Sequence, residues 1–338
     1  MVHRLLQIHA TASGTEAVRK LLTEGETVWW REHDRCEEGS NFAALVEVGS
    51  EQELLDALDL VMQKSEGSRL LALAVEATLP RIEEPVVEEV AQKRTSGRIS
   101  REELWDSLAN ASTLSWTYVA MVFLAAGVVI IGLIRDSAAV VIGGMVLAPL
   151  LGPNIALAFA AILADGKLAG RAMKAGLAGM VLALTISFVV GLFGGVVTDD
   201  NGVIVCREIR ARTEPHVLDL LLATAAGVAG AMSFTTALTT SLVGVMVAVA
   251  LMPPLAVCGM CMGAGQWELA EGAAVLLLTN LVCVDLAAVF TFLVQAIKPR
   301  DWWEVKRSRR VVRIVVLGLL LAVAALSVLV VLHSPARR

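Results

Sequence analysis

Polar side chains inside long apolar stretches are the residues of this chain whose types and positions suit chemistry. Asp285 lies about halfway along such a stretch, and Asn280 precedes it by five residues. A carboxylate inside a membrane costs about 2.5–3.5 kcal/mol on insertion scales, so an intramembrane acid is a functional candidate. Asp285 could carry a proton or face a cation; alternatively, as a neutral acid, it makes a hydrogen bond between helices. Asn280 is about 140° around a helix from Asp285, so the two do not share one stripe.

Two more polar residues accompany sequences that break helices. Asn154 directly follows Pro149-Leu-Leu-Gly152-Pro153. An amide at that place binds a substrate or satisfies backbone groups that the break leaves unpaired, and the sequence leaves both roles open. Ser241 begins a second apolar passage. The candidate substrate- or ion-binding residues are therefore Asn154, Asp285, Asn280 and Ser241, and the candidate helix breaks are Pro149, Gly152, Pro153, Pro253 and Pro254.

The two passages that contain these prolines form a repeat. Residues 137–149 and 241–253 each run from a serine to a proline, and they lie 104 residues apart. Proline removes a backbone donor and disturbs a helix, and in lipid the freed carbonyl needs a partner from protein or water. Matched interrupted segments in two halves of a chain indicate a transport site near the middle of the membrane.

Apolar runs of about 20 residues predict seven membrane spans. They cover approximately residues 114–134, 137–163, 168–197, 217–239, 241–264, 271–297 and 311–332. The offset of 104 residues also maps the starts of the first three spans onto the starts of the next three. Because a unit of three spans reverses direction when it is repeated, we expect a 3+3 inverted repeat plus one final span. The expected fold is an α-helical polytopic membrane domain.

The first 80 residues predict a separate, soluble α+β domain. Alternating and helical apolar spacings give the element order β-α-β-β-α-β, which is typical of a ferredoxin-like domain. On a strand, Trp29 and Trp30 would point to opposite faces, one into the core and one outward. The outward ring favours contact with another domain or subunit. Residues 1–98 carry 11 Lys and Arg against 18 Asp and Glu, and this acidity argues against a nucleic-acid partner.

The composition of the chain predicts the remaining domain borders and the orientation of the protein in the membrane. We predict a linker and interfacial helix over 81–112, the two three-span repeats over 113–298, and a basic loop with the final span over 299–338. Ten Lys and Arg lie in loops on the N-terminal side, against six on the other side, so the N-terminus is predicted to be cytosolic. The first ten residues lack the apolar core of a signal peptide, which agrees with a cytosolic N-terminus. The basic stretch Lys298–Arg313 predicts either contact with anionic lipid or a topology signal alone.

The apolar passages resemble a prokaryotic integral membrane family, the domain of unknown function 389. The similarity is carried by Asp136-Ser137, by Gly143-Gly-Met-Val-Leu-Ala-Pro149-Leu-Leu-Gly152-Pro153 and by the passage from Ser241 to Pro253-Pro254-Leu-Ala, within about residues 112–300. The resemblance implies a multi-pass protein of the bacterial or archaeal plasma membrane with an added soluble domain. It brings neither an activity nor a catalytic residue.

Together these features predict a transporter or channel for a small solute or ion, with a cytosolic domain for regulation or oligomerisation. The alternative is a non-transporting membrane sensor or scaffold whose soluble domain binds a ligand or partner. We expect no enzyme, because the chain has no H-E-x-x-H or G-x-S-x-G motif. We also expect no cofactor or metal: Cys258 and Cys261 lack an accompanying histidine or second cysteine pair, which favours simple packing. The outward tryptophan favours a homo-oligomer.

Overall fold

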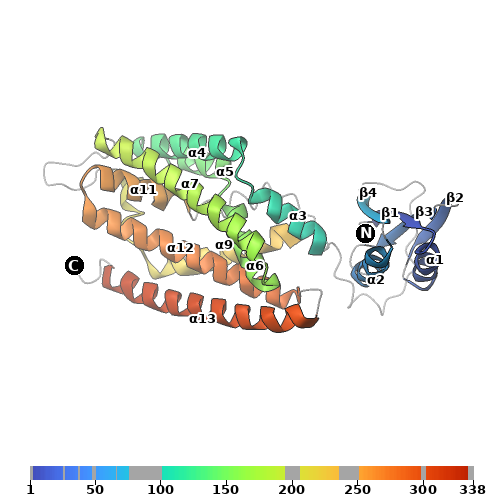
Figure 1. The fold of residues 1–338 in the computed structure, drawn as a ribbon. Helices are drawn as coiled ribbons and strands as arrows, with labels where there is room; N and C mark the ends of the chain where they lie inside the picture. The colour runs from blue at the N-terminus through green and yellow to red at the C-terminus, as the bar shows by residue number, and fades with distance from the viewer. Residues whose placement is uncertain are drawn as a thin grey trace, which may run out of the picture. The chain divides into compact units, whose positions relative to one another are not determined.

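The computed structural model of the chain divides into two compact units. One holds Met1–Leu104, and the other holds Trp105–Phe234 and Leu238–Arg338. The structure describes residues 3–25, 27–36, 39–47, 51–65, 67–75, 101–194, 206–235, 251–297 and 302–333 (Figure 1). Ser241 and the linker over 81–100 therefore lie outside the described residues.

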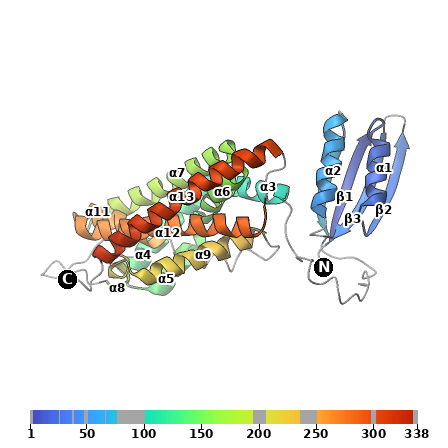
Figure 2. The ribbon, with the colours of Figure 1, turned by 90° about the horizontal axis from the view of Figure 1, so that it is seen from below.

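The smaller unit is an antiparallel sheet of four strands with two helices. Its elements follow in the predicted order: β1 His3–Thr11, α1 Thr15–Glu24, β2 Trp29–Cys36, β3 Gly39–Glu47, α2 Glu51–Lys64 and β4 Arg69–Val75. Hydrogen bonds arrange the strands in the order β2-β3-β1-β4, and every neighbouring pair is antiparallel. Figure 2 shows α1 and α2 packed on the sheet.

Successive side chains along each strand point to opposite faces of the sheet, and one of these faces is buried. Leu6 and Ile8 of β1 and Phe42 of β3 form a core with the apolar sides of α1 and α2. Trp30 joins that core, with its ring centroid 6.4 Å from that of Phe42. Trp29, on the opposite face, remains 48% exposed. The prediction that one tryptophan points inward and one outward is confirmed.

The larger unit consists of apolar helices. Among the described residues, five helices are long and apolar enough to cross a membrane: α4 Trp116–Ile134, α7 Gly166–Leu192, α9 Val217–Thr235, α12 Trp267–Val294 and α13 Trp302–His333. The count becomes six if the bent pair α5 Ala138–Leu147 and α6 Leu151–Leu163 is one span. Such a set of helices makes this unit a polytopic membrane domain.

The first proline passage breaks its helix as predicted. The axes of α5 and α6 differ by 52°, and Pro149 lies between them. The second passage is described only from Leu251, where Pro253 and Pro254 occupy the first turn of α11, Met252–Gly263. Prolines are tolerated there because the first N–H groups of a helix have no intrahelical partner. The predicted span over 241–264 is therefore described only in its second part.

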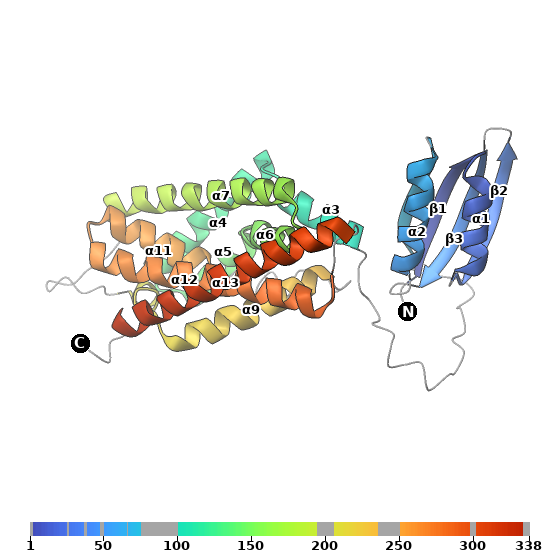
Figure 3. The same cartoon turned by 60° about the horizontal axis from the view of Figure 1, so that its bottom comes forward.

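Contacts among the membrane helices place α7 and α12 at the centre of the unit. Helix α7 packs against α4, α6 and α11, and α12 packs against α6, α11 and α13. Figure 3 shows α13 lying along α12. Two short helices complete the unit: α3 Arg101–Ala111 precedes the first span, and α8 Arg207–Arg210 precedes α9.

The end of α3 packs directly on the start of α6. A Cβ on Gly152 would lie only 2.7 Å from the Cβ of Ala111, so no side chain fits at this crossing. One turn from the start of α3, Trp105 donates a hydrogen bond to Asp165, which lies between α6 and α7. Part of the helix predicted to be interfacial is therefore held against protein.

Candidate functional site

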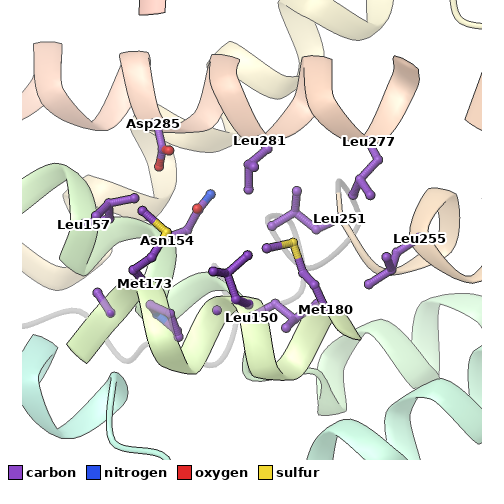
Figure 4. A pocket seen from close by; sticks show the side chains of 14 residues that line it. Leu150, Asn154, Leu157, Met173, Met180, Leu251, Leu255, Leu277, Leu281 and Asp285 are labelled. Atoms are coloured by element: carbon purple, nitrogen blue, oxygen red, sulfur yellow. The ribbon is translucent and has the colours of Figure 1, made fainter. Parts of the chain in front are cut away.

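The break between α5 and α6 borders a cavity of about 160 Å³, which we call the inner cavity. Its walls come from α6, α7, α11 and α12, and most of the lining side chains are leucine or methionine (Figure 4). Leu150 and Pro153 closely follow the first proline passage, and Leu251 and Leu255 flank the prolines at the end of the second. The ends of both passages therefore lie at one cavity.

Asn154 points into the inner cavity from the first turn of α6 (Figure 4). Its residue is 8% exposed, and its Nδ2 atom is buried without a hydrogen-bond partner among the described residues. The break at Pro149 starts a new helix at Leu151, and this start positions the amide. A buried donor without a partner is costly, so its place beside a cavity indicates a site for a ligand or water.

Asp285 faces Asn154 across the inner cavity from the second half of α12 (Figure 4). Its Oδ1 atom is also buried without a hydrogen-bond partner among the described residues. The structure thus brings together two of the four predicted binding residues, from helices that are far apart in the sequence.

The other two predicted binding residues do not join this pair. Asn280 is buried on α12 but does not line the inner cavity, as its angular separation from Asp285 predicts. Ser241 is outside the described residues. Among the predicted helix breaks, Pro153 lines the cavity, Pro149 lies at the bend, and Gly152 is at the crossing with α3.

Asp285 also lines a second, larger cavity of about 440 Å³, which we call the outer cavity. Its walls are α6, the start of α7, α12 and α13. Leu157 and Met173 line both cavities, so these two side chains and Asp285 separate them. At its other end the outer cavity reaches Asp165 and the exposed Gly166.

Asp165 is a residue that the sequence reasoning missed. Its carboxylate caps α7 by accepting from the backbone N–H groups of Lys167 (2.9 Å) and Leu168 (3.1 Å), and it accepts from Trp105 Nε1 at 3.0 Å. Partial burial acts to raise its pKa, but the three hydrogen bonds and the nearby Lys167 charge outweigh it, so the pKa lies below its ordinary value. The signal in the sequence is an Asp directly before a long helical stretch, a common N-cap pattern.

The cavities offer oxygen ligands but no metal cluster. No group of three His, Cys, Asp or Glu side chains that could hold a metal ion occurs among the described residues. Cys258 and Cys261 are buried free thiols in α11, and Cys258 Sγ lies 3.9 Å from the sulfur of Met262.

The fold and the cavities define a multi-pass helical membrane protein that carries a small N-terminal α+β unit. The chain belongs to the family called Domain of unknown function (DUF389), as its sequence predicts. The family's profile matches residues 145–286, which include Asn154 and Asp285. An uncharacterized protein of Methanocaldococcus jannaschii is 33% identical over 254 residues, which is 75% of this chain and 78% of that protein. A comparison with solved structures finds no match.

Proposed function

We propose that the protein is a transporter or channel for a small solute or ion, and that the ligand binds in the inner cavity between Asn154 and Asp285. The observation that carries this proposal is the convergence of two buried polar atoms without partners on one cavity. Unpartnered buried polar groups cost free energy, and a bound ligand offsets that cost by supplying the missing hydrogen bonds.

The packing of the helices supports an inverted repeat around this site. In such a repeat α6 corresponds to α11, and α7 corresponds to α12, as the 104-residue offset predicts. The contacts between helices follow this correspondence. Helix α6 packs on α7, and its counterpart α11 packs on α12; likewise α7 packs on α11, and its counterpart α12 packs on α6. Paired broken spans within an inverted repeat are a common architecture of secondary transporters.

The N-terminal unit fits a ferredoxin-like domain that regulates or assembles the protein. Its element order and its antiparallel β2-β3-β1-β4 sheet support that assignment. Its open face carries a row of apolar residues in register: Trp29, Leu45, Leu5 and Leu73. Trp29 and Leu73 are exposed, and such a row favours a homo-oligomer in which two sheets meet.

The proposed location is the plasma membrane of a prokaryote, with the N-terminal unit in the cytosol. The excess of Lys and Arg in the loops on that side supports the orientation. The basic stretch Lys298–Arg313 then lies where anionic headgroups are available, and it is proposed to contact them.

A cavity-filling variant tests the proposed function. Gly176 of α7 lines the inner cavity, and the nearest atom to an added Cβ is 3.7 Å away, so Gly176→Leu directs its side chain into the cavity. Gly170→Leu on the same helix is the matched control, because a Cβ at Gly170 has open space. We expect purified full-length protein in liposomes to take up at least one small ion or metabolite, and Gly176→Leu to abolish the uptake that Gly170→Leu retains.

Absence of uptake across a broad panel of ions and metabolites would favour the sensor or scaffold function instead. That alternative predicts a ligand that raises the unfolding temperature through the N-terminal unit. Equal uptake by the Gly176→Leu and Gly170→Leu variants would place the transport path outside the inner cavity.

A further inference from the structure

We propose that the ligand of the inner cavity is a small monovalent cation and that it reaches Asp285 from the Asp165 end through the outer cavity. This inference rests on the transport function proposed above and adds the class of ligand and its route. It is carried by the charges of the lining residues, by the chemistry of the two helix starts, and by the position of Asp285, which lines both cavities.

The charge of the lining residues selects for cations. Asp285 is the ionisable residue among the described residues that line the inner cavity, and the outer cavity adds Asp165. None of the described lining residues of either cavity is Lys, Arg or His. Acidic groups in a pathway with apolar walls concentrate cations and repel anions, because the surrounding low dielectric strengthens the field.

The helix starts at the inner cavity are poorly suited to an anion. Helices α6 and α11 both begin there, and helix N-termini attract anions through their free N–H groups. However, Pro153 lies in the first turn of α6, and Pro253 and Pro254 lie in the first turn of α11. Proline has no N–H, so the first turn of α6 loses one donor and that of α11 loses two, which weakens both helix starts as anion sites.

The two unpartnered atoms match a partly hydrated cation. Asp285 Oδ1 contacts the ion directly or accepts from one of its waters, and Asn154 Nδ2 donates to the oxygen of a further water that does not coordinate the ion. The inner cavity, at about 160 Å³, is close to the roughly 150 Å³ of a cavity that holds benzene, so an ion with a few waters fits.

One carboxylate and one amide are few ligands for a divalent ion. Calcium takes roughly six to eight oxygen ligands, and magnesium requires near-octahedral geometry. The described residues contain no group of three acidic, histidine or cysteine side chains for a metal. A monovalent ion, including a proton carried on the carboxylate, needs less coordination from protein.

The outer cavity provides the route. Alanines of α6 line one wall, and their small side chains leave the space open; Ala161 is among them. Helix α13 forms the opposite wall through Val311, Val315 and Leu319, which recur at helical spacing along one stripe. Ser308 of α13 donates a hydrogen bond to the carbonyl oxygen of Ile162, and this contact holds the wall against α6.

Flux measurements on the full-length protein in liposomes test the ligand class. We expect flux of H⁺, Na⁺ or K⁺ and no flux of chloride or glycerol. Asp285→Asn preserves the shape of the side chain and removes its charge, and we expect it to lower the cation flux by about tenfold or more. If only chloride or glycerol moves, or if Asp285→Asn retains the cation flux, the inference is wrong although transport stands. If nothing moves, the proposed function fails as well.

Two variants that fill the outer cavity from opposite walls test the route. Val315→Trp and Ala161→Phe are both expected to lower cation flux severalfold. Ile314→Trp is the matched control, because Ile314 is the neighbour of Val315 on α13 and is 64% exposed. Each variant is compared by its elution volume with the unchanged protein to verify folding. Wild-type flux in a folded Val315→Trp or Ala161→Phe protein would overturn the route.

Discussion

Asp285 and Asn154 face each other across the inner cavity from helices that are far apart in the sequence. A carboxylate and an amide in apolar surroundings stand out by type alone. The repeat does not pair them, because the 104-residue offset maps Asn154 onto Cys258 and Asp285 onto Val181. Their proximity arises from the packing of α6 against α12, and that long-range contact has no local signal in the sequence.

Asp165 contributes at the same scale through the cap that it gives α7. Asp165→Ala removes an acceptor for two backbone N–H groups and for Trp105, and we expect it to destabilise the protein by about 1 kcal/mol. Asp165→Asn is the control, because asparagine also caps helices. Thermal unfolding in detergent at neutral pH measures the difference. Equal melting of the alanine variant and the unchanged protein would contradict a stabilising cap.

The lowered pKa of Asp165 also fixes the sign of a pH effect in the same measurement. The pKa of Asp165 is lower in the folded protein than in the unfolded chain, so its charged form stabilises the fold. This contribution to stability is complete above the pKa of the unfolded chain, and it is lost as the pH falls through the pKa of the folded protein. Asp165→Asn keeps the cap but lacks the charge, so acidification should remove the charge-dependent part of the stability from the unchanged protein alone. The melting temperatures of the unchanged protein and of Asp165→Asn should therefore converge at low pH. A gap that widens at low pH would contradict this assignment.

At the scale of elements, the proline passages predicted the helix break but only part of its geometry. Pro149 interrupts the span, as proline chemistry requires. The 52° angle between α5 and α6 depends on what they pack against, including the crossing of Gly152 with Ala111. The elements of the N-terminal unit were predictable because its strands and helices carry clear apolar periods. The sequence indicated one site at the two proline passages, but the walls of the cavity were not predictable because they depend on the packing of four helices.

Close packing of α7 against α11 is a second element-scale feature, and it gives a stability prediction. A Cβ on Gly191 would collide with the backbone carbonyl of Met260, so Gly191→Ala forces the two helices apart. We expect a clear loss of thermal stability, of about 1–3 kcal/mol. Gly170→Ala on the same helix has open space, and it should be neutral or slightly stabilising because alanine favours helices. The melting temperatures of the two variants in detergent provide the comparison; similar values would mean that the contact is not tight.

At the scale of the whole molecule, two properties of different origin coexist in one chain. The helical unit has an inner cavity with sparse polar groups, and the N-terminal unit has an acidic composition and one open sheet face. The first suits a ligand that crosses the membrane, and the second suits contact between copies of the protein. Under the proposed function, joining such units would let oligomerisation influence transport, because a change at the sheet would alter which copies are held together.

The exposed row of the sheet makes the proposed oligomer testable. Trp29→Ser combined with Leu73→Ser removes the two exposed apolar side chains of the row, and buried aromatic anchors often dominate interface energy. We expect light scattering coupled to size exclusion to give a multiple of the monomer mass for the unchanged protein and a lower mass for the double variant. Leu60→Ser is the control, because Leu60 is also exposed, at 56%, but lies on α2, away from the row. A monomeric unchanged protein, or an unchanged mass in the double variant, would show that the sheet does not join copies, since an interface between two identical faces loses both of its anchors at once.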